Sequence, residues 1–457
     1  MRRILALSLL FTASVLLTAC ADVPEVPDTT PSAKPVIMGT RGPLTDKQSK
    51  ALFAKLGPDG QDMLQRHLAV EQAVAETPLL AGNKTRVLEN GPDTFRAMFE
   101  AIRAARDHIN LEYFILEDVK VDDLSLGDLL VAKRHQGVQV NLIYDSYGSI
   151  DTPDIFFDRL AHEGVNVVQY HPFNPIDAVA GGYSPNARDH RKILVVDGKL
   201  AIVGGVNLSA AYTSAGPGHQ IQKDEAHSLP WRDTDLQIEG PAVAQLQHLF
   251  LDQWQGEQGP ALDTSNFFPG LTEKGRDAVR IIGSSPDRNQ PRFYVTLLSA
   301  IRTAQKRVWL NTAYFVPTRQ EMEDLIAAAK RGADVRIVVP NSSDSDLAID
   351  VQHSRYEDLL EAGVRIYETH DEILHSKSAV IDGVWSVIGS SNFDHRSVTS
   401  NDEVDAVVVG GDTAQSLESL FTKDFAKANR IELAAWKDRP LADKMRELIA
   451  RTSQSML

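Results

Sequence analysis

Apolar residues in this chain gather in short runs, and two pairs of runs are separated by an Asp-Gly step. The first pair covers residues 193–196 and 200–203, and the second covers 379–381 and 384–388. The runs have the length of strands and are rich in β-branched residues, and Asp-Gly between such runs is a strong signal for a tight hairpin turn. The pattern therefore predicts two β-hairpins in distant parts of the chain.

The segments around the hairpins also occur twice. FEAIRAARDHINL at 99–111 matches LSAIRTAQKRVWL at 298–310, and both segments have the pattern of a helix that runs into a strand. Each half of the chain alternates helix and strand, which predicts an α/β fold of two repeats, each a mixed sheet flanked by helices. We predict a first repeat over 80–256, a linker over 257–275 and a second repeat over 276–440.

Each predicted hairpin carries the same polar motif, His-x-Lys-x4-Asp, followed by a glycine-containing turn and an Asn. A single His-x-Lys-x4-Asp should arise by chance in roughly three chains per hundred, so two copies with matching tails indicate a shared function. Strand alternation places the His and Lys of each copy on one face. The first copy is His190, Lys192, Asp197, Gly204, Gly205 and Asn207, and the second is His375, Lys377, Asp382, Gly389, Ser390 and Asn392.

These residue types suit displacement at a phosphodiester. The reaction needs cations to offset the charge of the phosphate, a nucleophile, and a proton donor for the leaving oxygen. Two facing motifs supply a nucleophilic imidazole, an acid/base imidazole and two lysine charges. We include Asp197 and Asp382 in the catalytic set, although Asp before Gly at a hairpin tip is also a common turn former.

Composition narrows the class of protein. The 457 residues are 43% hydrophobic and carry a formal net charge of −15, and the sequence contains no block of Lys and Arg interleaved with aromatics. This composition argues against nucleic acid as a partner. The histidines outside the two motifs lack the local spacing of a metal site, so we predict neither a metal nor another cofactor.

The N-terminus resembles that of an exported bacterial lipoprotein. Arg2 and Arg3 precede an apolar run at 4–17, and the single cysteine, Cys20, ends a Leu-Thr-Ala-Cys segment that resembles a lipobox. We expect a signal peptide over 1–20, lipidation of Cys20, and a location in the bacterial cell envelope, on the periplasmic face of the outer membrane.

Two further segments flank the repeats. Residues 21–44 are rich in Pro and predict an extended tether, which is followed by a helical segment over 45–79. A C-terminal helix over 441–457 carries an apolar stripe at Leu441, Met445, Leu448 and Ile449. Such a stripe normally packs on a core, with membrane contact as the alternative.

Taken together, the paired motifs resemble those of the phospholipase D superfamily, and within it those of bacterial cardiolipin synthases and their lipoprotein-like relatives. Residues 189–192, 231–233, 144–146 and 312–317 are similar to cardiolipin synthase segments. The resemblance implies two repeats about a pseudo-twofold axis, one active site at their interface, and a metal-free reaction through a phosphohistidine.

The resemblance also implies roles for individual residues. His190 would be the nucleophile and His375 the acid/base, while Asp233 and Glu403 would orient them, a surface ion pair being the alternative for each acid. Asn207 and Asn392 would contact phosphate, unless they only form turns. The implied function is a membrane-tethered phosphatidyltransferase acting on phospholipids. The alternatives are a phospholipase D that uses water, a periplasmic nuclease of the same superfamily, and a lipid-binding lipoprotein without activity.

Overall fold

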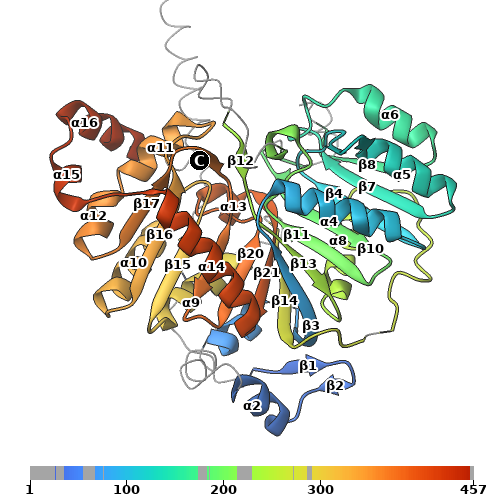
Figure 1. Cartoon of the computed structure of the whole chain (residues 1–457), viewed down its shortest axis with the longest axis horizontal. Coiled ribbons are helices and arrows are strands. Elements are labelled where there is room, and N and C mark those ends of the chain that lie inside the picture. The colour runs from blue at the N-terminus through green and yellow to red at the C-terminus, as the bar shows by residue number, and fades with distance from the viewer. Residues whose placement is uncertain are drawn as a thin grey trace, which may run out of the picture.

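The computed structural model describes residues 26, 35–54, 67–75, 77–172, 183–184, 186–213, 229–270, 272–285 and 291–452. Its two halves lie side by side, each a mixed sheet flanked by helices (Figure 1). The signal peptide, Cys20 and most of the predicted tether lie outside the described residues.

The first half contains a seven-strand sheet. Three parallel strands occupy its outer edge, and four strands with antiparallel pairing continue it toward the middle of the molecule. From the outer edge inward, the order is β8 (Asn166–Tyr170), β7 (Gln139–Asp145), β4 (His108–Tyr113), β10 (Lys192–Val196), β11 (Leu200–Gly204), β13 (Asp235–Glu239) and β3 (Leu79–Leu88).

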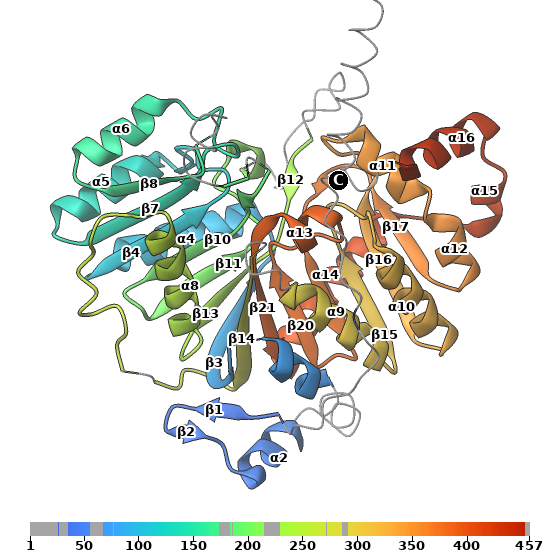
Figure 2. The same ribbon diagram turned by 180° about the vertical axis from the view of Figure 1, so that it is seen from behind.

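The second half repeats this order. From the middle outward it contains β14 (Asp277–Ser284), β21 (Asn401–Val409), β20 (Trp385–Gly389), β19 (Ser378–Ile381), β15 (Arg307–Asn311), β16 (Asp334–Pro340) and β17 (Arg365–Thr369). The two first strands, β3 and β14, pair antiparallel at the centre, so the two sheets form one continuous sheet with a pseudo-twofold relation between its halves (Figure 2).

Helices cover both faces of this sheet, and their starts follow local capping rules. Asn90, Ser125 and Thr318 accept backbone N–H groups at the starts of their helices, and Thr318 forms a full capping box with Glu321. The larger helices are α4 (Gly91–Ala104), α5 (Leu126–His135), α6 (Asp154–His162), α8 (Val243–Gly256), α9 (Arg292–Thr303), α10 (Arg319–Lys330), α11 (Asp346–His353), α12 (Tyr356–Glu361) and α14 (Gly411–Lys427).

One part of the hydrophobic core is shared by the two repeats. Alternate residues of β10 and β11 face opposite sides of the sheet, one set toward α4 and the other toward α8. The second set belongs to a cluster that runs beneath α8 and α14 and contains residues of both repeats, such as Ile193 and Val404. This shared apolar core holds the two halves in a fixed relation.

The two predicted hairpins are confirmed. β10 and β11 join through Asp197 and Gly198, whose φ angles are 53° and 59°, and β19 and β20 join through Asp382 and Gly383, at 51° and 70°. Two consecutive positive φ angles define the hairpin turn that Asp-Gly favours. Between Gly256 and Asp277 the described residues contain no helix or strand, and the linker bounds of 257–275 stay a prediction.

The N-terminal region differs from its prediction. Residues expected in an extended tether instead form β1 (Ile37–Gly39) and β2 (Gly42–Pro43), and β1 pairs in parallel with β3. Val26 packs against Tyr294 and Leu298. The apolar side chains of Ile37 and Val26 are buried against the rest of the protein. The proline content of the segment gave no indication of this burial. In the predicted helical segment, the structure has α2 (Asp46–Ala54) and a further helix at 67–74.

Several short elements complete the fold. None of the helices within the described residues is long and apolar enough to cross a bilayer. The short elements are β5 (Lys120–Val121), β6 (Leu124–Ser125), β9 (Arg188–Asp189), η1 (Ala210–Tyr212), β12 (Trp231–Arg232), β18 (Ile373–Leu374), α13 (His395–Thr399), β22 (Asn429–Arg430), α15 (Leu433–Lys437) and α16 (Leu441–Ala450).

Candidate active site

Two short strand pairs cross from one repeat to the other and bring the motifs together. β9 pairs in parallel with the start of β21, and β12 pairs in parallel with β18. As a result His190 N donates to Asp402 O at 2.9 Å, and His375 N donates to Arg232 O at 2.7 Å. Each motif histidine is therefore fixed to the residue directly before an acid of the other repeat.

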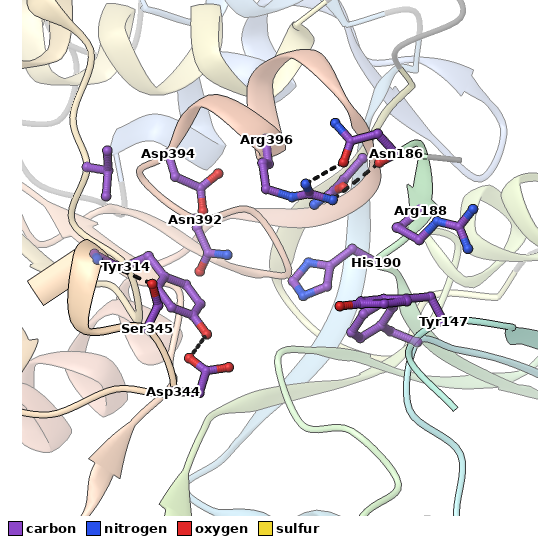
Figure 3. Close-up of a pocket in the computed structure, with 14 residues that line it drawn as sticks. Tyr147, Asn186, Arg188, His190, Tyr314, Asp344, Ser345, Asn392, Asp394 and Arg396 are labelled. Carbon is purple, nitrogen blue, oxygen red and sulfur yellow. Dashed lines mark hydrogen bonds between the residues drawn. The ribbon is translucent and has the colours of Figure 1, made fainter. Parts of the chain in front are cut away.

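A cavity of about 600 Å³ opens between the repeats beside His190 (Figure 3). The first repeat contributes Phe114, Tyr147 and His190 to its wall, and the second contributes Tyr314 and Asn392. The ring of Tyr314 stands edge-on to that of His375, with centroids 6.2 Å apart, so the second imidazole lies just behind the cavity wall. The volume suits an organic ligand that both repeats contact.

Each imidazole is hydrogen-bonded to a carboxylate of the opposite repeat. His190 Nδ1 lies 3.0 Å from Glu403 Oε2, and His375 Nδ1 lies 2.7 Å from Asp233 Oδ2. A carboxylate on Nδ1 fixes the ring and holds the proton there, which leaves the lone pair on Nε2. The pairing thus leaves both rings able to react through Nε2. Both acids are buried within the site, so neither is a surface ion-pair partner.

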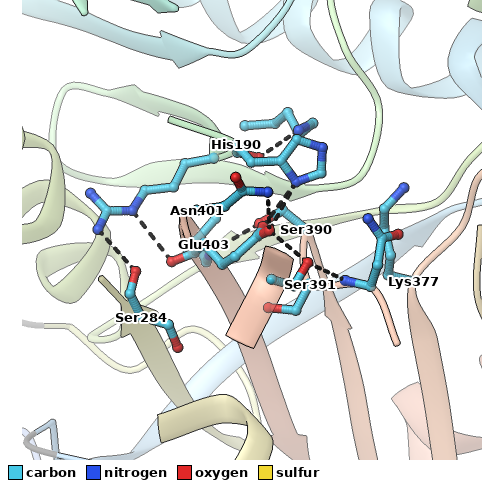
Figure 4. Close-up of polar contacts among 12 residues, drawn as sticks. His190, Ser284, Lys377, Ser390, Ser391, Asn401 and Glu403 are labelled. Atoms are coloured by element: carbon cyan, nitrogen blue, oxygen red, sulfur yellow. Dashed lines mark hydrogen bonds and ion pairs between the residues drawn. The ribbon is translucent and has the colours of Figure 1, made fainter. Parts of the chain in front are cut away.

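Further polar groups hold Glu403 in place. Ser390 Oγ donates to Glu403 at 2.5 Å and Ser397 Oγ at 2.8 Å, while Asn401 Nδ2 lies 3.4 Å away (Figure 4). Burial opposes ionisation of Glu403, but the charges of His190 and Lys192 outweigh it and keep the pKa of this carboxyl below its ordinary value. His190 therefore faces a firmly held anion.

The one position at which the motif tails differ has a physical reason. At Gly205, an added Cβ would lie 2.1 Å from Asp233 Oδ1, so only glycine fits beside that carboxylate. The equivalent Ser390 fits in the second repeat, where the acid is Glu403 and the hydroxyl bonds to it. The first repeat supplies no such hydroxyl, and Asp233 instead accepts Thr234 N at 2.7 Å.

Each motif lysine lies beside the histidine of its own motif. Lys192 is fully buried and its Nζ donates to His190 O. Lys377 Nζ lies 2.8 Å from His375 Nδ1 and 3.6 Å from Asp233. Burial lowers the pKa of Lys192 to about 7 and also lowers the pKa of Lys377.

The pKa values of the histidines report how close the two motifs are. Burial lowers the pKa of His190 to about 4, and the charges of Lys192 and Lys377 act in the same direction, against Glu403. Burial and the same two lysines lower the pKa of His375 well below its ordinary range. Each imidazole thus senses the lysine of the other motif, as one shared site requires.

The two motif asparagines differ in position. Asn207 is 1% exposed, its Oδ1 accepts Ile115 N and its Nδ2 donates to Tyr212 OH. The amide of Asn207 is thus bonded within the first repeat and does not line the cavity, and its phosphate contact stays a prediction. Asn392 lies on the cavity wall, and its Oδ1 has no hydrogen-bond partner among the described residues. Its phosphate contact stays a prediction.

The structure also corrects the expectation that Asp197 and Asp382 belong to the catalytic set. Asp197 accepts the backbone N–H groups of Arg106, Asp107 and His108, and Asp382 accepts those of Gln305, Lys306 and Arg307. Both lie at hairpin tips, at the ends of β10 and β19 away from the histidines. They join each hairpin to the start of the neighbouring strand.

We expect Asp197→Ala to lower the free energy of unfolding by about 1–3 kcal/mol, because three backbone donors lose a charged acceptor. Asp197→Asn should lose less, since the amide oxygen still accepts and Asn tolerates a positive φ. Chemical denaturation followed by circular dichroism measures both, and turnover of the folded fraction should stay within twofold of wild type. A large loss of turnover in fully folded Asp197→Asn would restore Asp197 to the catalytic set.

Sequence reasoning missed several residues that support the site. Tyr212 OH lies 3.1 Å from His375 Nδ1, and Trp231 stacks obliquely on the same ring with centroids 4.7 Å apart. Asp235 and Asp405 each follow a histidine-bound acid by two residues and accept backbone N–H groups of the turns after the motifs. The repeated Asp-x-Asp and Glu-x-Asp spacing was the available signal for this last pair.

Metal-ligand residues are not gathered in this site. Within the described residues there is no group of three or more His, Cys, Asp or Glu placed to hold an ion. The acids beside the imidazoles are instead occupied by histidine, lysine and hydroxyl partners. The expectation of a metal-free, cofactor-free reaction stays a prediction.

The fold and site together define a duplicated phosphodiester-transfer scaffold with one composite centre. The family described as "Cardiolipin synthase, PLD-like domain" matches residues 98–216 and 297–425. The chain belongs to this phospholipase D-like cardiolipin synthase family.

Curated relatives agree with this assignment, and one solved structure shares the fold. The chain is 34% identical over 393 residues to a cardiolipin synthase of Geobacillus thermodenitrificans, which covers 86% of this chain and 75% of the relative. It is 30% identical over 402 residues to a probable cardiolipin synthase of Bacillus subtilis, covering 87% and 77%. The fold is similar to that of phosphatidylserine synthase from Haemophilus influenzae, with a TM-score of 0.63, 12% identity and coverage of 86% and 100%.

Proposed function

We propose that the protein is a phosphatidyltransferase that moves a phosphatidyl group from one phospholipid to the alcohol of another, forming cardiolipin or a related lipid. The observation that carries the proposal is the crossed arrangement of two His–carboxylate pairs with two buried lysines beside one cavity. The family and its curated relatives support the phospholipid substrate class.

The first step would form a bond between His190 Nε2 and phosphorus while the bond from phosphorus to the leaving alcohol oxygen breaks. His375 would donate its proton to that oxygen, so that a neutral alcohol departs and a phosphohistidine remains. Lys192 and Lys377 would offset the charge on the non-bridging oxygens. In the second step the acceptor hydroxyl would return a proton to His375, attack phosphorus and release His190.

The lysines also link the protonation of His375 to the binding of substrate. In the free site, burial and the charges of the two lysines lower the pKa of His375 and keep this ring neutral. A phosphodiester anion between them offsets those charges, and His375 then gains affinity for a proton as the substrate binds. The same anion favours the charged forms of the lysines, so binding and proton uptake reinforce each other.

We expect kcat/KM to fall as pH rises above about 7. The pKa of Lys192 is lowered to about 7, so this residue is charged below that pH and loses its charge above it. His190 is neutral from about pH 5 upward because its pKa is about 4. A pH profile of kcat/KM reports the free enzyme. Lys192→Arg should move the basic limb to higher pH, and a wild-type profile that stays flat to pH 9 would contradict this assignment.

We propose that the chain is a cell-envelope lipoprotein anchored through Cys20, because the signal-like run at 4–17 leads into the Leu-Thr-Ala-Cys segment that ends at that residue. A lipid anchor would place the site beside a substrate that resides in the bilayer.

The test is product analysis with purified protein and phosphatidylglycerol. Mass spectrometry should detect cardiolipin and glycerol, and neither should form with His190→Asn. Phosphatidic acid as the only product, even with excess phosphatidylglycerol as acceptor, would replace the transferase by a hydrolase. Cleavage of single-stranded DNA at low salt, absent from His190→Asn, would point to a nuclease.

A further inference from the structure

The C-terminal helix α16 presents its apolar face to the outside. Leu441, Met445, Leu448 and Ile449 are 72%, 57%, 63% and 67% exposed. Their spacing places all four on one face of the helix. The structure thus contradicts the expectation that this stripe packs on the core.

Polar contacts on the inward face hold α16 in this orientation. Glu447 is 3% exposed and forms an ion pair with Arg439, and Arg446 Nε lies 2.8 Å from Asp350 in α11. Ala450 packs in a cluster with Val316 and Ala348, and these two residues also line the catalytic cavity. The outward apolar face is therefore fixed beside the cavity rather than free to turn inward.

A second apolar group stands on the other side of the cavity. Tyr147, Ile150 and Ile155 are 49%, 59% and 74% exposed, and Tyr147 lines the cavity itself (Figure 3). Ile155 lies in the first turn of α6. α16 and α6 lie at the same end of the molecule as β12, one on each side, whereas β1 and β2 lie at the opposite end (Figure 1).

These two groups contain most of the exposed large apolar residues. Nine such residues occur in the part of the chain that the structure describes, and seven of them belong to the two groups beside the cavity. The other two, Val36 and Phe268, lie elsewhere. Val36 immediately precedes β1, and Phe268 follows Phe267, whose carbonyl approaches the hairpin turn at Gly198, away from His190. The apolar exposure is thus concentrated around the cavity.

We propose that α16 and the 147–155 segment seat the mouth of the cavity on a phospholipid bilayer. Any flat partner that contacts both groups also covers the mouth between them. A protein there would block the entry of substrate, whereas a bilayer contains the substrate, so only the bilayer is compatible with turnover by the proposed function on which this inference rests. The net charge of −15 opposes electrostatic attraction to anionic lipids, so apolar insertion must supply the adhesion.

The single cysteine allows a direct test of insertion. In a full-length Cys20→Ser background, Met445→Cys or Ile155→Cys would be labelled with an environment-sensitive fluorophore, with Phe268→Cys as the matched control. Vesicles of phosphatidylglycerol and phosphatidylethanolamine should raise the fluorescence severalfold and shift it to the blue at the first two sites only. No change at Met445 and Ile155, or the same change at Phe268, would overturn the proposal. So would a change that follows protein concentration without vesicles, which would assign the surface to a second copy of the chain.

Kinetics provide a second test that is independent of probes. Leu448→Ser with Ile449→Ser should lower kcat/KM on vesicles by about tenfold through the loss of two inserted side chains. Turnover of a short-chain phospholipid below its micelle concentration should stay within twofold, and Val36→Ser with Phe268→Ser should change neither rate. Equal losses on both substrates would contradict a bilayer-specific role. Failure of the wild-type protein to turn over the short-chain lipid would contradict the proposed function. The fluorescence measurement does not depend on turnover and would still test membrane insertion.

Discussion

Replacing His190 with Asn should lower phosphatidyl transfer by at least about 10⁴-fold, because the amide cannot form the covalent bond to phosphorus and the step has no substitute nucleophile. His375→Asn should also reduce turnover strongly, through the loss of the proton donor and acceptor, by roughly 10²- to 10⁴-fold. Steady-state assays on phosphatidylglycerol measure both losses. His135→Asn, at an exposed histidine of α5, is the matched control and should keep wild-type activity.

The leaving group separates the two roles. A substrate with an activated phenolate leaving group does not need a proton donor in the first step. His375→Asn should then release phenolate in a burst that approaches one equivalent and afterwards stall, whereas His190→Asn should give no burst. A burst from His190→Asn, with none from His375→Asn, would reverse the assignment of nucleophile and acid.

Glu403→Gln should lower turnover by roughly 10²- to 10⁴-fold, by analogy with the loss seen when a histidine-orienting carboxylate becomes an amide. An amide nitrogen facing Nδ1 favours the wrong tautomer of His190, and the ring then presents no lone pair at Nε2. Steady-state kinetics and thermal unfolding would be measured together, because Ser390 and Ser397 also lose part of their acceptor. Glu163→Gln, at a half-buried carboxylate outside the site, should behave as wild type.

The crossed pairing of acids and histidines predicts which acid variant the activated substrate rescues. Since Glu403 contacts His190 and Asp233 contacts His375, each acid assists the histidine of the other repeat. The activated substrate should therefore rescue the burst in Asp233→Asn but not in Glu403→Gln. If each acid assisted the histidine of its own repeat, the rescue would appear in Glu403→Gln instead.

The sequence was sufficient for the features that local patterns encode. The Asp-Gly steps, strand alternation and repeated helix–strand segments predicted the hairpins, the α/β class and the two repeats, and the structure and the family match bear these out. The residues at the centre, His190, Lys192, His375 and Lys377, were identified from the motifs alone. Their convergence on one site also follows from the resemblance.

The features that the sequence left open or predicted wrongly depend on distant contacts. The partners of Glu403 and Asp233 are set by β9 on β21 and β12 on β18, and no pattern within one repeat reports those pairings. Asp197 was placed in the catalytic set because it belongs to the motif in sequence, but strand length carries it to the far end of β10. The helix α16 has an ordinary amphipathic pattern, and its contacts with Arg439, with α11 and with the Val316 cluster leave its apolar face pointing outward.

The central claim is that one phosphorus atom passes through His190 with His375 beside it. The most direct measurement is to mix full-length His375→Asn with the activated phospholipid, quench in alkali to preserve phosphohistidine, and map the modified peptide by mass spectrometry. We predict one phosphatidyl group on His190, absent when His190 is Asn. An unmodified His190 in protein that has released its equivalent of phenolate would contradict the account.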